Sequence, residues 1–168
     1  MSIKEDIVIK DSCTIIDHCE LGLLEIFFSM GLSVYTTPNV IAEITEPEQA
    51  ALVSRYVNSG HLKVDGAGDV SMITTIVIEN PALSPADGSV LELAIRLQAT
   101  ILTSDGSLRR VSQAKHVPVR GSLWVIEEMI ARELLNKETA LAKLEQYPTV
   151  NPRAPKKEIS ALIEKLKG

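Results

Sequence analysis

The chain has 168 residues, of which 45% are hydrophobic and 23% are charged, and this balance is typical of a folded domain rather than of a disordered chain. The formal net charge of −5 argues against a nucleic-acid binder that works through bulk positive potential, although bound divalent cations can reverse the sign of a local acidic site. No apolar run approaches the roughly 20 residues that cross a bilayer. Lys4, Glu5 and Asp6 stand where a signal peptide would be apolar, so we expect a cytoplasmic protein without a membrane partner.

Strands alternate with helices along the chain. Short apolar or β-branched segments predict five strands, at residues 7–10, 33–37, 61–65, 100–103 and 117–120. Apolar spacing, capping residues and prolines predict helices over 18–30, 38–46, 47–60, 69–78, 85–98, 105–114, 123–135, 137–146 and 159–166. Residues 69–78 also have β propensity, and the proline-rich segment 147–155 is expected to be an extended connector.

This alternation is typical of a three-layer α/β fold, in which helices cover both faces of a mostly parallel sheet. We expect residues 1–135 to form that domain and residues 136–168 to form a helical extension packed on or beside it. The two cysteines are too few for a disulfide framework, and neither they nor the three histidines lie at a spacing typical of a zinc site.

Four acidic residues stand where strands end or helices begin. Asp11 follows the first strand, and Asp105 follows the fourth and can cap the next helix. Asp87 lies in the first turn of its helix, and Glu43 lies within about two turns of a helix start, close enough to reach back. Because ligands of open α/β sheets bind outside the carboxyl ends of the strands, we expect these four side chains to point at one place.

Gathering four unpaired carboxylates costs several kcal/mol of repulsion and desolvation. That cost is tolerable when hard cations bind between them, and an oxygen-rich set without a group of His and Cys favours Mg²⁺ or Mn²⁺ over Zn²⁺. One or two such ions can activate water for in-line attack on a phosphodiester. Each acid has a local explanation as a cap, a turn residue or a surface acid, but the four together favour metal-assisted phosphodiester hydrolysis.

Four motifs in order resemble the acidic motifs of PIN domains. They are Asp11-Ser12, residues 40–44, residues 83–87 leading into 91–94, and residues 102–108, and the resemblance covers about residues 6–132. Gly121-Ser122-Leu123 and the Asn151-Pro152-Arg153 tail are similar to a subgroup of prokaryotic PIN proteins.

The resemblance implies a five-stranded parallel sheet in the order 3-2-1-4-5 and an endoribonuclease that uses Mg²⁺ or Mn²⁺ on single-stranded RNA. It also implies roles for six residues. The metal ligands or water-positioning acids would be Asp11, Glu43, Asp87 and Asp105, and Ser12 and Thr103 would carry hydroxyls that orient those carboxylates.

Many proteins of this kind are dimeric toxins neutralised by an antitoxin peptide in the acidic groove, so an antitoxin and a second copy are expected partners beside RNA. We expect a homodimer to form through exposed helices such as 123–135. The acidic balance and the C-terminal extension are less typical of a compact toxin, so the resemblance supports the nuclease more strongly than the toxin.

Three alternatives use similar residues. A phosphoacceptor receiver domain needs an acid pair after its first strand and a lysine after its fifth, where this chain has Arg120. A haloacid-type phosphatase needs Asp-x-Asp, but Cys13 holds the second acid position. A PIN-like fold kept as a non-catalytic RNA-binding or docking module stays open. Glu92 lies about 140° around the helix from Asp87, so we expect a solvent-facing or groove-edge acid there.

Overall fold

A five-stranded parallel sheet organises the molecule, which a computed structural model describes over residues 7–168. The strands run in the order β3-β2-β1-β4-β5, which confirms the expected fold class and strand order. They are β1 (Ile7–Lys10), β2 (Ser33–Thr36), β3 (Leu62–Val64), β4 (Thr100–Leu102) and β5 (Val119–Arg120). In the centre, Val8 of β1 is in register with Val34 on one side and with Thr100 on the other.

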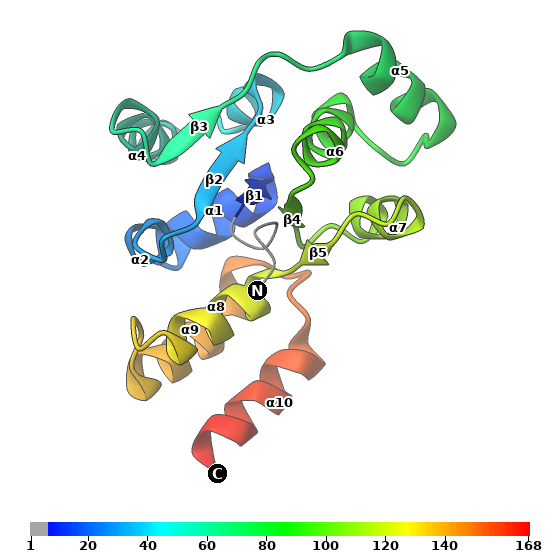
Figure 1. Ribbon diagram of the computed structural model, residues 1–168. Coiled ribbons are helices and arrows are strands. Elements are labelled where there is room, and N and C mark those ends of the chain that lie inside the picture. Colours follow the sequence, from blue (N-terminus) through cyan, green and yellow to red (C-terminus); the bar gives the residue numbers. More distant parts are fainter. Residues whose placement is uncertain (1–6) are drawn as a thin grey trace.

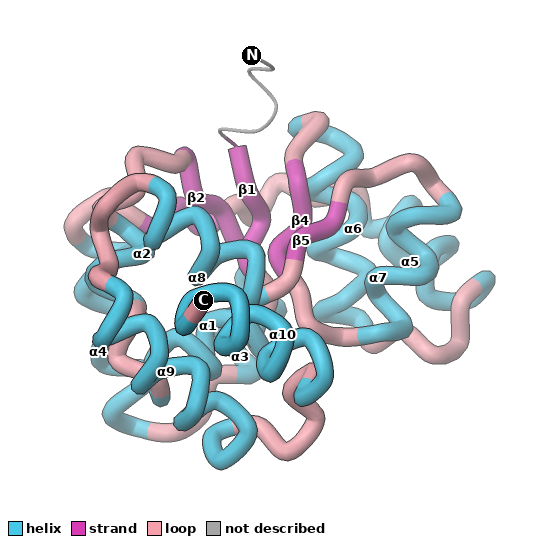
Figure 2. Tube along the Cα trace, turned by 90° about the horizontal axis from the view of Figure 1, so that it is seen from below, coloured by secondary structure: helices cyan, strands magenta, loops and turns pink. Residues whose placement is uncertain are grey.

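Helices cover both faces of this sheet (Figures 1 and 2). They are α1 (Ser12–Glu20), α2 (Leu24–Phe28), α3 (Pro38–Glu43), α4 (Pro47–Asn58), α5 (Val70–Glu79), α6 (Pro85–Leu97), α7 (Gly106–Ala114), α8 (Ser122–Ala131), α9 (Lys137–Val150) and α10 (Lys156–Lys167). Helices α1, α2, α8 and α9 pack together on one face, and α5, α6 and α7 lie on the other. Within residues 7–168, no helix has both the length and the apolar character needed to cross a membrane.

The helix starts follow local capping chemistry. Thr37 accepts a hydrogen bond from the amide of Val40 and Pro38 occupies the first turn, so α3 begins directly after β2. Asp69 caps α5 through the amide of Met72, and this confirms the helix in the segment whose propensity was ambiguous. The centre of the core lies on the central strands, with Val8, Ile9 and Ile101 fully buried, and α6 packs Leu91 and Leu93 into it.

The expected single helix over residues 18–30 is wrong. The chain forms two helices. The first begins at Ser12, six residues before His18, because Asp11 caps α1 through the amide of Thr14. Gly22 then separates α1 from α2 with a φ of +68°. Gly31, expected to stop this segment, has a φ of +80° and follows α2. The helix expected over 123–135 likewise ends early, at Ala131.

The extended connector expected over residues 147–155 is wrong for its first part, because α9 continues through Pro148 to Val150. A proline inside a helix removes one hydrogen bond and costs about 3 kcal/mol. The side chain of Tyr147 offsets that cost, since it is fully buried and donates its hydroxyl to Asp17 Oδ2 of α1 at 3.2 Å. Asn151, the residue after α9, donates its amide to the same carboxylate at 3.3 Å. These contacts join the C-terminal helices to the sheet domain.

Candidate active site

Asp11 lies directly after β1 and is only 4% exposed. Its Oδ1 accepts hydrogen bonds from the Thr14 amide at 3.0 Å and from the Thr14 hydroxyl at 2.9 Å, and its Oδ2 accepts the hydroxyl of Thr103. The Cys13 thiol lies 3.1 Å from both oxygens. Burial raises the pKa of Asp11, although these hydrogen bonds act in the opposite direction. The carboxyl is therefore held in one orientation at the end of the central strand.

Asp105 is tied to Asp11 through one hydroxyl. The Asp105 amide donates to Thr103 Oγ1 at 3.0 Å, and the same hydroxyl donates to Asp11. Asp105 caps α7, because its Oδ2 accepts the amide of Leu108 at 2.8 Å. Thr103, fully buried just after β4, thus connects two acids that are far apart in the chain.

Asp87 belongs to a capping box at the start of α6. The Ser84 amide donates to Asp87 Oδ2 at 2.9 Å, and the Asp87 amide donates to Ser84 Oγ at 3.1 Å. Partial burial raises the pKa of Asp87, and the nearby charges of Asp105 and Glu43 raise it further. Asp105 and Glu43 are therefore close enough to Asp87 for their charges to act on it.

Glu43 is the exposed last residue of α3, and Ser12 donates its hydroxyl to Glu43 Oε1 at 2.8 Å. A chain of hydroxyl contacts fixes α3 against α6. Thr37 Oγ1 lies 2.7 Å from Ser89 Oγ, and Ser89 donates to the Ala86 carbonyl at 2.7 Å. The ends of β1, β2 and β4 and the start of α6 are thereby joined at one edge of the sheet.

The four acids form an open edge rather than a closed cage. Among residues 7–168, no three His, Cys, Asp or Glu side chains lie close enough together to enclose a metal ion. None of the ion pairs in this part of the chain involves any of the four acids. Their capping bonds use Oδ2 of Asp87 and of Asp105, which leaves Oδ1 of each for a ligand. Within residues 7–168 the edge therefore presents four acids that are not engaged in ion pairs.

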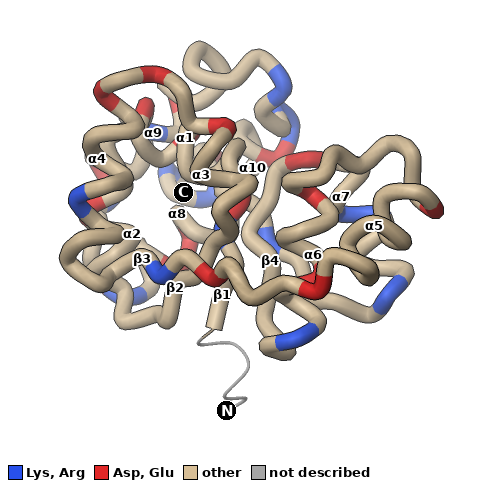
Figure 3. The backbone as a smooth tube through the Cα atoms, turned by 90° about the horizontal axis from the view of Figure 1, so that it is seen from above, with Lys and Arg blue, Asp and Glu red and all other residues tan. Residues whose placement is uncertain are grey.

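Figure 3 shows that the Lys and Arg positions of the described chain are spread over many elements rather than gathered on one face. The chain as a whole also carries a formal net charge of −5. A polyanion would consequently depend on local contacts here, because no broad basic surface attracts it.

The expectation of a solvent-facing or groove-edge acid at Glu92 is wrong. Glu92 is only 2% exposed, and Arg96, one turn later on α6, donates Nε to Glu92 Oε2 at 2.9 Å. Arg96 also pairs with Asp65 just after β3, at 3.0 Å. Neutralisation by Arg96 allows this carboxylate to be buried beside Gly68, where an added Cβ would lie 3.1 Å from Glu92 Oε1.

Sequence patterns missed the surroundings of Asp11. Lys10, at the end of β1, is fully buried, and its ammonium lies against His18 and 3.9 Å from the centre of the Phe27 ring. Burial lowers the pKa of Lys10 to about 7. A lysine at the end of an apolar strand is the only sequence signal of this position, and it does not reveal burial. Thr14 was missed for the same reason, since its contact with Asp11 depends on where α1 begins.

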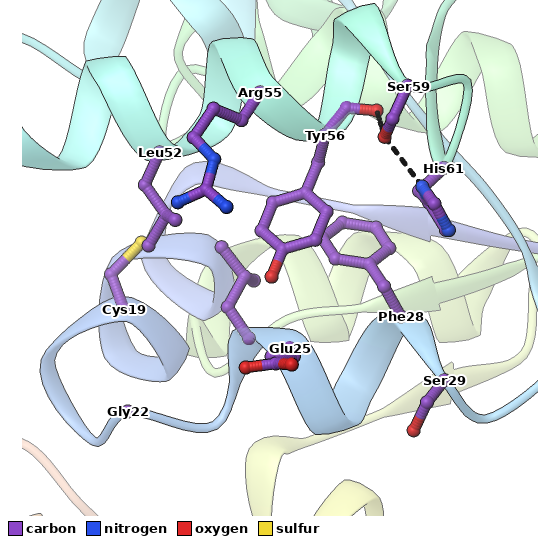
Figure 4. A pocket seen from close by; sticks show the side chains of 11 residues that line it. Cys19, Gly22, Glu25, Phe28, Ser29, Leu52, Arg55, Tyr56, Ser59 and His61 are labelled. Atoms are coloured by element: carbon purple, nitrogen blue, oxygen red, sulfur yellow. Dashed lines mark hydrogen bonds between the residues drawn. The ribbon is translucent and has the colours of Figure 1, made fainter.

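A separate cavity of about 610 Å³ lies between α2 and α4 (Figure 4). The rings of Phe28 and Tyr56 stack in it with their centroids 4.4 Å apart, and the Ser59 hydroxyl lies 2.6 Å from Nδ1 of His61. None of the four acids lines this cavity. The stacked rings pack α2 against α4 here, away from the acidic edge.

Comparisons with known proteins identify the family of the chain and agree with its fold. The family model described as DUF3368, PIN domain, matches residues 7–168. Endoribonuclease Nob1 of Pyrococcus abyssi (strain GE5 / Orsay) is 31% identical over 93 residues, covering 51% of this chain and 58% of Nob1, so the chain spans little more than half of that relative's length. The crystal structure of PAE2754 from Pyrobaculum aerophilum matches with a TM-score of 0.53 and 12% identity, over 77% of this chain and 99% of that chain. This last likeness shows the fold.

Proposed function

The chain belongs to the PIN domain family, and from that premise we propose that it is an endoribonuclease that uses Mg²⁺ or Mn²⁺ to hydrolyse phosphodiester bonds of single-stranded RNA. Proteins of this family are typically nucleases, and the distant relative Nob1 is named an endoribonuclease. The observation that carries the proposal is the edge of Asp11, Glu43, Asp87 and Asp105, none of which forms an ion pair with a basic side chain of residues 7–168.

The donor set fits a hard cation. Mg²⁺ commonly binds one or two carboxylates together with waters and substrate phosphates, rather than a cage made only of protein. The open edge matches that pattern, because Oδ1 of Asp87 and Oδ1 of Asp105 carry no capping bond. The Cys13 thiol is poorly suited to bind a softer metal as a thiolate, since burial and the charge of Asp11 raise its pKa well above the ordinary thiol value.

In this mechanism acids of the edge would hold the cation and position the attacking water, with waters and the substrate phosphate completing the coordination. A bound cation would supply an activated water and stabilise the negative charge that develops on the phosphate oxygens. Thr103 keeps Asp11 and the start of α7 in fixed relation, and Ser12 orients Glu43. Hydrolysis adds water across one P–O bond and leaves two shorter strands.

The partners that we propose follow from the same surfaces. An acidic edge without its own cations suits an antitoxin segment that carries Lys or Arg, in the case that the protein is a toxin. Helix α8 buries Val125, Ile126 and Met129 and, among its residues, exposes no large apolar side chain. Helix α5 does, since Val70 is 75% exposed and Ile78 is 71% exposed. We therefore place the contact of a homodimer on α5.

A non-catalytic RNA-binding or docking module is the second candidate. One observation favours it: Asp11 is already saturated with hydrogen bonds from Thr14 and Thr103, as a purely structural cap would be. The two candidates differ in the outcome of a cleavage assay.

The test uses labelled single-stranded RNA with the wild-type chain and with Asp11→Asn, in Mg²⁺, in Mn²⁺ and in EDTA. The nuclease proposal predicts metal-dependent cleavage by the wild type that Asp11→Asn abolishes. RNA binding without cleavage of any strand in either metal would instead establish the binding module.

A further inference from the structure

A second cavity, of about 370 Å³, lies beside the acidic edge. The loop after β4, the start of α8 and the connection between α9 and α10 form its walls. Ser104, which stands between Thr103 and Asp105, lines it. The cavity therefore begins where the acidic edge ends, and residues of the C-terminal extension complete it.

Backbone amides without a partner inside the helix lie at the start of α8. Gly121 is the N-cap of this helix of 10 residues and supplies no side-chain acceptor. The first intrahelical bond of the new helix comes from the amide of Val125 to the Gly121 carbonyl, so the three preceding amides have no partner within the helix. Such amides, together with the helix dipole, favour an anion.

The side chains around these amides are donors that are loosely engaged. Ser104 Oγ lies 3.3 Å from Ser122 Oγ and 3.5 Å from the hydroxyl of Tyr147, distances at or near the limit of a hydrogen bond. A ligand oxygen can therefore take the hydroxyls of Ser104 and Ser122 without breaking a strong contact, whereas the Tyr147 hydroxyl stays on Asp17.

Two arginines reach the same cavity. The Arg109 guanidinium lies close to Gly121, where an added Cβ would be 3.1 Å from Nη2, and it donates only to the Thr103 carbonyl, at 3.4 Å. Arg153 is exposed on the connection between α9 and α10. Within residues 7–168, neither arginine forms an ion pair, while Arg96 and Arg132 do. Two guanidinium groups without carboxylate partners thus face one hollow with free amides.

We propose that this cavity binds a phosphate group of the RNA strand next to the phosphate that is cleaved, through Arg109, Arg153 and the amides at the start of α8. The proposal rests on the proposed nuclease function, because it names a subsite for the same substrate. Guanidinium groups and helix amides are the donors that recognise phosphate best, and they supply locally the attraction that the overall charge of −5 does not. The C-terminal extension is thereby part of the substrate site.

The first test measures binding of a fluorescein-labelled single-stranded RNA in EDTA, where no metal-dependent cleavage occurs. Arg153→Ala and Arg109→Ala are compared with Arg55→Ala, which removes the same charge from the exposed face of α4. For each lost phosphate contact, the slope of log K against log salt should fall by about 0.7. Arg55→Ala should leave the slope at the wild-type value. Equal slopes in all three variants would overturn the proposal.

The second test uses inorganic phosphate and follows backbone amides by NMR. Phosphate should shift the amides of Ser122, Leu123 and Trp124, and Glu158→Gln should tighten its binding because Glu158 lines the cavity. Glu164→Gln is the matched control, since it removes the same charge from the exposed side of the same helix. Unshifted amides, or equal gains in the two variants, would contradict a phosphate site here.

The two proposals can fail separately. If the wild type cleaves RNA but Arg153→Ala binds it with an unchanged salt slope, the phosphate site is wrong and the nuclease stands. If no RNA is cleaved but the arginine variants lose salt-dependent binding, the phosphate site stands and the nuclease proposal fails.

Discussion

Two carboxylates on the same helix have opposite surroundings. Glu92 is buried against Arg96, which also pairs with Asp65, whereas Asp87, near the start of α6, has only further acids as charged neighbours. The hydrogen bonds from Arg96 hold the pKa of Asp65 below its ordinary value, while burial and the charges of Asp105 and Glu43 raise that of Asp87. The difference teaches that a buried acid with a basic partner stabilises the fold, whereas a group of acids without one is kept for a ligand.

The largest expected effect separates these two groups by activity. Asp11→Asn should lower metal-dependent cleavage by at least about 1,000-fold, roughly 4 kcal/mol of transition-state stabilisation, because it removes a charged ligand of the cation. Glu92→Gln, made on the neutralised pair, should leave the single-turnover rate per folded molecule within about threefold of the wild type. If both variants lost activity equally, the distinction drawn here between the two groups would be wrong.

The reverse contrast is expected in stability. Arg96→Met leaves Glu92 buried without a partner, and breaking a buried ion pair costs about 3–5 kcal/mol. Since the Arg96 side chain is 32% exposed, we expect the lower end of that range, about 3 kcal/mol, from urea unfolding. Glu128→Gln, which breaks the exposed pair with Arg132 and leaves the bond from Arg132 to the Met30 carbonyl in place, serves as the control and should cost less than about 1 kcal/mol. A loss below that value for Arg96→Met would show that the network contributes little.

Metal binding should stabilise the folded protein through the four acids of the edge and not through the carboxylates that pair with Arg96. At a Mg²⁺ or Mn²⁺ concentration of about 100 times Kd, the wild type should gain about 2.7 kcal/mol of unfolding free energy, because the cation binds the folded state. Asp87→Asn should lose most of this gain at the same concentration, and Asp65→Asn should keep it. Thermal unfolding with and without the metal measures both, and an equal gain in the two variants would argue against a site at the acidic edge.

The smallest effect is a pair of opposite pH dependences in EDTA. The pKa of Asp87 is raised in the folded state, so its contribution to stability is full below about 3.8 and is lost as the pH rises through the raised value. The pKa of Asp65 is lowered, so its contribution is full above about 3.8 and is lost as the pH falls through the lowered value.

Relative to the wild type, Asp87→Asn should therefore become the more stable protein as the pH rises through the acid range. Asp65→Asn should become the less stable one over the same range. Melting temperatures of the three proteins between pH 3 and pH 6 measure these differences, and trends of the same sign in both variants would contradict the assigned surroundings.

Local chemistry made much of the acidic edge predictable. The strand pattern located Asp11 and Asp105, and the capping signal of Ser84 placed Asp87 in the first turn of α6. Each of these signals lies within a few residues of the acid that it positions. The alternation of strands and helices likewise predicted the parallel sheet, whereas its order was implied by the family that the motifs resembled.

Long-range packing explains the failures. Glu92 is buried because Arg96 and Asp65 neutralise it, and Asp65 belongs to a different segment of the chain. Pro148 remains inside α9 because Tyr147 is anchored on Asp17 of α1, a contact between residues far apart in sequence. No local pattern records such partners, so helix ends and buried charges were the features that the sequence could not supply.

The most direct test of the acidic edge is a crystal of the protein grown or soaked with Mn²⁺ and measured for its anomalous signal. We expect a peak within about 2.2 Å of a carboxylate oxygen of Asp87, Asp105 or Asp11, with waters completing the coordination of the ion. An edge that stays empty at saturating Mn²⁺, or a peak at the pair of Glu92 and Asp65 instead, would contradict this expectation.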